Sequence, residues 1–423
     1  MVLGIRRRLA GRVYYGWVVV GACLLAAMAT FGTSYTFGVF FDAFIREFGV
    51  GRGPLGFVFG LQTALLFAGG LVAGRAVDRY GGRRVAAVSG ALLASGLGWA
   101  AFARSYLELL AAFGVLAGLG MGGLYVVGYA ILPQWFERRR GTASGIAAAG
   151  TGVGLVTLPG AADRLIGSVG WRPALLAVAG AAGLLALLVV LLFADRHADV
   201  GADPAVEFED GDAGGIGAGP GAPATPSPGI PAETRETIRS GQFLLVFLGW
   251  TGIYAPVYVL LSHVVLYASD AGFGRSTGVF AITVLGVTIV LARVGIGALS
   301  DRVGRVATFV ASGGLVGLAL VALPLAPTPA AFLGGVVAFA VGYSGTGSLL
   351  SSMLADLFGN EGLNTMFGAS SLAFGVAGLA APPLAGFWFE AAGSYDPAFH
   401  AVGVVGLLGA GCIVLAAWLT PDR

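Results

Sequence analysis

The stretch Gly74-Arg-Ala-Val-Asp78-Arg79-Tyr80-Gly81 has a counterpart 223 residues later, Gly297-Ala-Leu-Ser-Asp301-Arg302-Val303-Gly304. Both copies have the pattern G-x-x-x-D-R-x-G, and each follows a long apolar run. A short polar pattern at matching places in an apolar chain indicates an internal repeat. The two copies therefore predict a chain built from two similar halves.

The sequence around the two copies is almost continuously apolar. Of its 423 residues 57% are hydrophobic and 11% are charged, and the mean hydropathy is +0.86. A soluble domain carries about 25% charged residues, so too little polar surface is available for a water-soluble fold. The net charge of +2 and the presence of only two cysteines also exclude a nucleic-acid-binding protein and a disulfide scaffold.

Twelve segments are long enough to cross a bilayer, since a helix needs about 20 apolar residues to span the hydrocarbon. They are too long and too evenly apolar for barrel strands. The predicted spans are 15–41, 55–76, 85–103, 107–133, 142–161, 173–194, 243–267, 278–299, 307–326, 330–354, 366–389 and 399–419. We expect an all-α membrane protein whose twelve transmembrane helices form two pseudo-symmetric six-helix halves, 1–194 and 242–423, which is the usual layout of secondary transporters.

Residues 195–241 form a low-complexity segment that is acidic at first and rich in Gly and Pro from 211 to 231. Its few apolar residues do not offset the entropy of ordering, so we expect a disordered cytoplasmic linker between the halves. The chain has no lysine, and 17 of its 24 arginines fall on the side of the linker and both termini. Because basic residues mark the cytoplasmic side, we expect a multi-pass protein of the plasma membrane with both termini in the cytoplasm.

Arg293 is the one arginine well inside a predicted span; Arg75 stands next to the cytoplasmic end of 55–76. It stands eight residues before Asp301, about 12 Å along a helix, where an arginine costs about 2.5–3.5 kcal/mol. No carboxylate of a neighbouring span is placed to pair with it. A guanidinium binds a carboxylate through two hydrogen bonds, so we expect Arg293 to bind an anionic substrate. The alternative is an arginine satisfied by backbone carbonyls or extended towards the cytoplasmic surface.

His263 and several tyrosines are the other polar candidates within the spans. Histidine titrates near neutral pH, so His263 is a candidate substrate contact and proton carrier; a ring satisfied by a carbonyl or packed among aromatic residues is the equal alternative. Small-ligand pockets use a few placed hydroxyls on an apolar wall. Tyr35, Tyr125 and Tyr343 are the candidate substrate tyrosines, on spans one, four and ten.

The paired D-R-x-G pattern resembles the major facilitator superfamily, and the resemblance extends over the whole chain. In that family the acidic residue and its arginine hold the cytoplasmic ends together while the site faces outwards. The resemblance implies a gating role for Asp78 and Arg79 against the C-terminal half, and for Asp301 and Arg302 against the N-terminal half. The alternative is that Gly serves a tight turn and Arg only sets topology.

A narrower resemblance, to the monocarboxylate transporter and oxalate–formate antiporter group, lies in Tyr15–Val19, in Phe37–Phe41 and in the block Trp135–Gly150. It implies that Arg293 is the substrate arginine. The chain departs from animal members at Ile289, where they have aspartate, and at Tyr35, where they have lysine. It also lacks the span-eleven lysine of oxalate carriers. One fixed cation suits a monoanion better than a dianion.

We therefore expect a secondary transporter, not an enzyme, that moves a small organic monocarboxylate by alternating access, with a proton as the candidate second cargo. An anion exchanger of the oxalate–formate type and a non-transporting membrane sensor of the same fold are the alternatives. No catalytic, cofactor or metal site is expected, because the spans hold no Ser/His, di-Asp or metal-ligand set. The expected partners are the substrate and the lipid bilayer, and the expected functional unit is a monomer.

Overall fold

Helices build the membrane region of the computed structural model, which describes residues 14–130, 135–136, 140–195, 232–359 and 361–420. Within these ranges twelve helices are long and apolar enough to cross a bilayer, and no strand occurs. The predicted all-α fold is confirmed. Helices are the expected solution, because each backbone N–H and C=O in hydrocarbon needs an internal partner.

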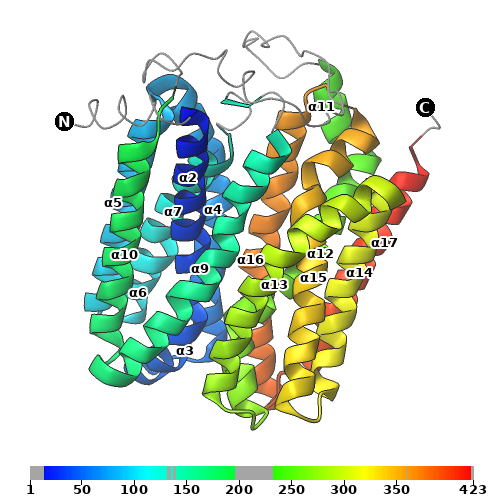
Figure 1. Ribbon diagram of the computed structural model, residues 1–423. Helices are drawn as coiled ribbons and strands as arrows, with labels where there is room; N and C mark the ends of the chain where they lie inside the picture. Colours follow the sequence, from blue (N-terminus) through cyan, green and yellow to red (C-terminus); the bar gives the residue numbers. More distant parts are fainter. Residues whose placement is uncertain (1–13, 131–134, 137–139, 196–231, 360, 421–423) are drawn as a thin grey trace.

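The spans stand in two sets of six, side by side in Figure 1. The first set comprises α2 (Tyr15–Ala27) with the π-helix η1 (Met28–Gly32) and α3 (Thr33–Phe48), α4 (Arg52–Tyr80), α5 (Gly82–Phe102), α6 (Tyr106–Leu109) with η2 (Leu110–Ala117) and α7 (Gly118–Ala130), α9 (Arg140–Val169) and α10 (Trp171–Leu192). The second comprises α12 (Gly241–Asp270), α13 (Arg275–Val303), α14 (Arg305–Ala322) with η5 (Leu323–Leu325), α15 (Pro329–Phe358), α16 (Leu363–Ala392) and α17 (Asp396–Trp418).

Several helices continue past the ends of the predicted apolar spans. Asp78 and Arg79 belong to the last turn of α4 rather than to a loop, and Asp301 and Arg302 belong to the last turn of α13. The glycine of each pattern ends the helix, with φ of 84° at Gly81 and 100° at Gly304. Left-handed backbone of this kind favours glycine, so the D-R-x-G pattern encodes a helix end.

Part of the predicted linker is ordered. Residues 196–231 lie outside the described ranges, but Ala232–Arg239 form the helix α11. The expected disorder is wrong for this segment, because Thr234 is buried against Gly362 at the start of α16.

We call the end of the bundle at α11, where α4 and α13 finish, the α11 end. The opposite end, where α4 and α13 begin, is the α3–α4 end (Figure 1).

The halves meet chiefly along two helix pairs, α4 with α16 and α9 with α13, and also where α3 faces α12. The backbones approach closely there: a Cβ on Gly60 would lie 2.7 Å from the Gly378 oxygen, and one on Gly152 would lie 2.7 Å from the Gly286 oxygen. Small residues permit such packing between membrane helices. These pairs frame the centre of the molecule, where the candidate site lies.

Candidate functional site

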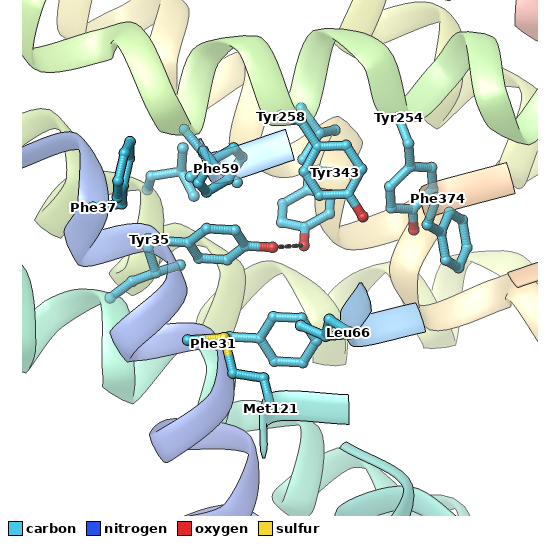
Figure 2. Packing of buried hydrophobic residues seen from close by; sticks show 14 of the residues in the cluster. Phe31, Tyr35, Phe37, Phe59, Leu66, Met121, Tyr254, Tyr258, Tyr343 and Phe374 are labelled. Atoms are coloured by element: carbon cyan, nitrogen blue, oxygen red, sulfur yellow. Dashed lines mark hydrogen bonds between the residues drawn. The ribbon is translucent and has the colours of Figure 1, made fainter. Parts of the chain in front are cut away.

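Aromatic side chains from both halves meet near the middle of the molecule (Figure 2). Tyr35 on α3 and Tyr343 on α15 point towards each other, and their hydroxyl oxygens are 3.3 Å apart. Both side chains are buried. The structure therefore brings together two of the candidate tyrosines, one from each half; their contact with substrate stays a prediction.

Tyr254 and Tyr258, which the sequence analysis did not single out, belong to the same cluster. They lie one turn apart on α12, beside Tyr343 in Figure 2. The ring of Tyr254 packs on Phe374 of α16 with centroids 4.2 Å apart. The available signal was their spacing of four residues, which places both phenols on one face of a helix. We call Tyr35, Tyr254, Tyr258 and Tyr343 the tyrosine cluster.

Tyr125 of α7 lies at the border of the tyrosine cluster. Its ring makes edge contacts with Phe31 and Phe67, at centroid distances of 6.0 and 5.5 Å. Phe31 in turn stacks on Tyr35 at 5.9 Å. Tyr125 is thus connected to the cluster through Phe31.

Arg293 is half-buried on α13, one turn from the middle of that helix towards the α11 end. Its Nη1 donates a 2.7 Å hydrogen bond to the Ala148 carbonyl of α9, in the other half. Its Nε is buried and has no partner. Among the described residues no carboxylate lies within ion-pair distance of this guanidinium. Of the three guanidinium nitrogens, one is thus bound to a backbone carbonyl, as the alternative interpretation expects. The positive charge of Arg293 has no negative partner among the described residues.

The guanidinium borders the tyrosine cluster. A Cβ placed on Gly347 of α15 would lie 3.3 Å from Arg293 Nη2 and 4.0 Å from the Tyr254 hydroxyl. A cation between apolar rings and phenols is costly unless an opposite charge joins it. This arrangement can hold a small anion between the halves.

His263 is fully buried on α12, nearer the α3–α4 end. Its Nε2 lies 2.9 Å from the carbonyl oxygen of Pro382 on α16, and its Nδ1 lies 2.8 Å from the Tyr395 hydroxyl. Because a carbonyl oxygen only accepts, Nε2 carries the proton donated to Pro382, and in the neutral ring Nδ1 accepts the Tyr395 hydroxyl. Phe41 of the N-terminal half covers the ring at a centroid distance of 5.1 Å.

The structure does not bring His263 to Arg293. Tyr254, which borders Arg293, lies nine residues before His263, about 13 Å along the helix. Burial raises the pKa of the Tyr395 phenol above its ordinary value, so this hydroxyl stays protonated at neutral pH. The two filled ring nitrogens match the expectation of a structurally satisfied histidine, and a substrate or proton role stays a prediction.

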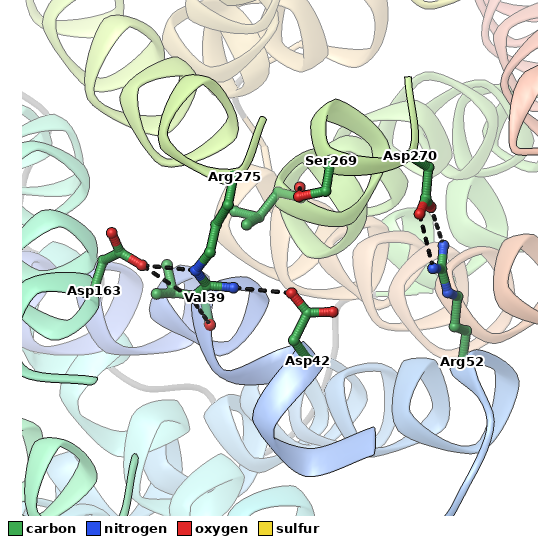
Figure 3. A network of polar contacts seen from close by, with 8 residues as sticks. Val39, Asp42, Arg52, Asp163, Ser269, Asp270 and Arg275 are labelled. Carbon is green, nitrogen blue, oxygen red and sulfur yellow. Dashed lines mark hydrogen bonds and ion pairs between the residues drawn. The ribbon is translucent and has the colours of Figure 1, made fainter. Parts of the chain in front are cut away.

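Arg275 joins three segments at the α3–α4 end (Figure 3). From the first turn of α13 its Nη1 reaches Asp42 of α3 at 3.0 Å. Its Nε and Nη2 reach one oxygen of Asp163 on α9 at 3.0 and 2.9 Å. Nη2 also donates to the Val39 carbonyl at 2.7 Å. All these partners belong to the N-terminal half, so this guanidinium connects the two halves.

Arg52 makes the reciprocal connection. From the start of α4 it forms a bidentate ion pair with Asp270, the last residue of α12 (Figure 3). Its guanidinium also lies 3.6 Å from the ring centroid of Phe389. The sequence analysis did not single out Arg52 or Arg275. Their partners were not recognisable from spacing, because Asp270 and Asp42 lie 218 and 233 residues away along the chain.

The four expected gating residues lie at the α11 end. The side chains of Asp78, Arg79, Asp301 and Arg302 are exposed, and within the described part of the chain none of them forms an ion pair. Among the described residues, the side-chain ion pairs that join the halves all lie at the α3–α4 end. The gating role of these four residues stays a prediction.

The chain is similar to known membrane transporters. The family model described as Major Facilitator Superfamily matches residues 23–296 and 278–423. Monocarboxylate transporter 13 of Bos taurus is 27% identical over 406 residues, covering 95% of this chain and 89% of that protein. Monocarboxylate transporter 3 of Rattus norvegicus is 30% identical over 405 residues, covering 92% and 77%.

A solved structure shares the fold. The crystal structure of a bacterial homologue of the human lysosomal transporter Spinster, in an inward-facing and unoccupied conformation, matches with a TM-score of 0.72 at 16% sequence identity. The match covers 96% of this chain and 98% of that chain. A likeness over nearly the full length of both chains shows that the twelve helices have the same arrangement.

Proposed function

The chain belongs to the Major Facilitator Superfamily and is a multi-pass membrane transporter, not an enzyme; from this premise we propose that its substrate is a small organic monocarboxylate. The observation that carries the proposal is the half-buried Arg293, which has one carbonyl partner and, among the described residues, no carboxylate. A monoanion neutralises this charge, whereas a dianion adds an uncompensated one. The names of the relatives point to the same substrate class.

The proposed mechanism is alternating access around the tyrosine cluster. The ion pairs of Arg52 and Arg275 hold the halves together at the α3–α4 end in the state described here. In the opposite state the α11 end closes, and Asp78, Arg79, Asp301 and Arg302 brace the facing half. The arginine bias supports a plasma-membrane orientation with the α11 end and both termini in the cytoplasm. The proposed unit is a monomer.

A proton is the proposed second cargo, with His263 as its carrier. His263 lies under Phe41 of the opposite half, so opening the α3–α4 end uncovers the ring. The charged and titratable groups nearest to it are Tyr395, which it contacts, and Arg52, which stacks on Tyr395 and pairs with Asp270. Anion exchange is the second candidate, because no carboxylate among the described residues stands beside Arg293 to bind a proton with the substrate.

Purified protein in liposomes tests this function. Labelled acetate, propanoate, lactate, pyruvate, oxalate and succinate are offered with and without an inwardly directed proton gradient. We expect uptake of at least one monocarboxylate, faster with the gradient, and little uptake of the two dianions. Uptake that needs unlabelled substrate inside and ignores the gradient would identify the exchanger. Absence of uptake for every anion would refute the proposed substrate class.

A further inference from the structure

Gly347 opens a space directly beside Arg293. It lies on α15, one turn beyond Tyr343 towards the α11 end. A Cβ added there would meet only two atoms within 4 Å, Arg293 Nη2 at 3.3 Å and the Tyr254 hydroxyl at 4.0 Å. Most buried glycines of this protein face backbone or packed side chains instead, as Gly342 of the same helix faces the Ser312 carbonyl at 2.6 Å. The missing side chain of Gly347 thus leaves room at a cation and a phenol.

The guanidinium presents an unused edge at this space. Nη1 of Arg293 is occupied by the Ala148 carbonyl, whereas Nε is buried without a partner and Nη2 is the atom nearest to Gly347. The N–H groups of Nε and Nη2 point from the same edge of the planar guanidinium, which is one of the two edges that bind a carboxylate. A buried donor without an acceptor is uncommon and calls for an explanation.

Arg275 shows what this edge does elsewhere on the same helix. Its Nε and Nη2 hold the Asp163 carboxylate at 3.0 and 2.9 Å, while its Nη1 points to a different partner, Asp42. Arg293 has the same division of roles, with Nη1 on Ala148 and the Nε–Nη2 edge empty. The protein supplies the carboxylate for Arg275 from its own chain and supplies none, among the described residues, for Arg293.

We propose that Gly347 is a specificity-determining residue: the substrate carboxylate occupies the space at Gly347, on the Nε–Nη2 edge of Arg293 and within reach of the Tyr254 hydroxyl. This inference rests on the proposed function and places its substrate. A carboxylate oxygen bound to Nη2 lies about 2.8 Å from it, so a Cβ at 3.3 Å competes for the same volume. The space at Gly347 therefore accommodates a compact carboxylate that contacts the backbone of α15.

The test substitutes Gly347 and compares a matched glycine of the same helix. Gly334 also lies on α15, and a Cβ there meets nothing within 4 Å. The probe is whichever of acetate, propanoate, lactate or pyruvate the wild type takes up fastest in liposomes. We expect Gly347→Ala to raise the KM at least tenfold, Gly347→Val to stop uptake, and Gly334→Ala to stay within twofold of wild type. Tyr254→Phe, which keeps the ring on Phe374, should raise the KM severalfold.

Alanine favours a helix more than glycine does, so the alanine variants keep the helix, and size-exclusion profiles check the folding of each variant. A wild-type KM in Gly347→Ala overturns the inference and leaves the proposed function standing. An equal loss in Gly334→Ala also overturns the inference, since the loss would then follow from replacing a glycine of α15 away from Arg293. If the wild type takes up no monocarboxylate, the proposed function itself is wrong, and the carboxylate position proposed at Gly347 is wrong with it.

Discussion

At the scale of single residues, Arg293 allows substrate binding to be tested alone, because it takes part in none of the ion pairs that join the halves. Arg293→Ala should lower uptake by about 30-fold or more, because losing one partner of a buried charge pair costs about 2–5 kcal/mol. Arg293→Lys should recover little, since an ammonium lacks two parallel N–H groups on a rigid plane. Initial uptake rates at equal amounts of folded protein measure both. Wild-type affinity in the alanine variant would show that the anion binds elsewhere.

His263 supplies a second residue-scale prediction, on pH dependence. Opening the α3–α4 end removes Phe41 from the ring, so a proton can reach it from outside, and the Tyr395 hydroxyl then turns from donor to acceptor. Net uptake should therefore rise as external pH falls through the near-neutral range. His263→Gln should flatten this dependence while exchange of internal for external substrate continues. Tyr395→Phe is the companion variant, which keeps the histidine and removes its hydroxyl partner. An unchanged pH profile in His263→Gln would leave the histidine with a structural role.

The sequence predicts residues of this site when their chemistry is rare in a membrane span. Arg293 stands out because a charged residue in an apolar run is costly. Gly347 does not, because the chain has 72 glycines and composition cannot tell which one borders a guanidinium. Tyr254 is missed for the same reason, since its role depends on the face of α12 that meets α15. The positions of Gly347 and Tyr254 next to Arg293 depend on packing between helices that are far apart in the chain.

At the scale of helices, the first turns of α4 and α13 carry the contacts that close the α3–α4 end. Arg275→Gln should weaken this closure, because one guanidinium serves both Asp42 and Asp163 across the halves. In Arg275→Gln, cysteines introduced between the halves, just inside the α3–α4 end, should react severalfold faster with water-soluble maleimides than in the wild type. Arg172→Gln is the matched control: Arg172 pairs with Glu47 at 2.7 Å at the same end, but within one half. Equal labelling in Arg275→Gln and Arg172→Gln would show that the cross-half pairs do not hold this end closed.

The last turns of the same two helices should act in the opposite direction. Asp301 has no ion-pair partner within the described residues, so its expected lock forms only when the α11 end closes. Asp301→Asn should therefore favour the state described here and make probes at the α11 end react faster, as should Asp78→Asn. Asp356→Asn is the control, because Asp356 pairs with Arg305 within the C-terminal half at 3.3 Å. If both aspartate variants label like this control, the D-R-x-G pattern only ends helices and sets topology.

The helices themselves were predictable, and their ends were less so. Apolar length alone identifies all twelve spans, since hydrocarbon leaves the backbone few alternatives. It makes spans such as 55–76 and 278–299 too short at both ends, because Arg52, Asp78 and Arg275 are polar residues that nonetheless belong to helices. The π-helix η1 in the first span was not foreseen either. Gly32 in that segment approaches Gly154 of α9 so closely that a Cβ would lie 2.8 Å from its Cα, and such a contact has no local sequence signal.

At the scale of the whole molecule, the repeat places equivalent charged residues at both ends of the two helices that carry it. Arg52 stands as far before Asp78 as Arg275 stands before Asp301, and α4 and α13 each have 29 residues. Each of these helices is about 43 Å long. Each begins with an arginine at the α3–α4 end and has an Asp-Arg pair in its last turn at the α11 end. A rigid helix that joins the facing half at only one end at a time gives two exclusive states. This is the physical requirement of alternating access.

In the proposed mechanism, Arg293 also sets an energetic difference between the loaded and the empty transporter. When the site is closed from both sides, an empty Arg293 is a cation in a largely apolar interior with one carbonyl partner. A bound monocarboxylate neutralises it through two charge-assisted hydrogen bonds. The closed intermediate is therefore more accessible to the loaded transporter, because an unpaired buried charge is far costlier than a paired one. Reorientation without substrate should be the slow step of net transport.

This argument predicts that substrate on the far side accelerates uptake. Liposomes preloaded with an unlabelled monocarboxylate should take up the labelled one severalfold faster than empty liposomes, because the return step then carries substrate. One monoanion replaces another in this exchange, so an imposed membrane potential should leave the exchange rate unchanged. Net uptake into empty liposomes should in contrast depend on the proton gradient, which supplies the compensating positive charge. Equal rates into preloaded and empty liposomes would show that the empty transporter reorients freely, and that Arg293 finds in the closed state a partner that the present state does not provide.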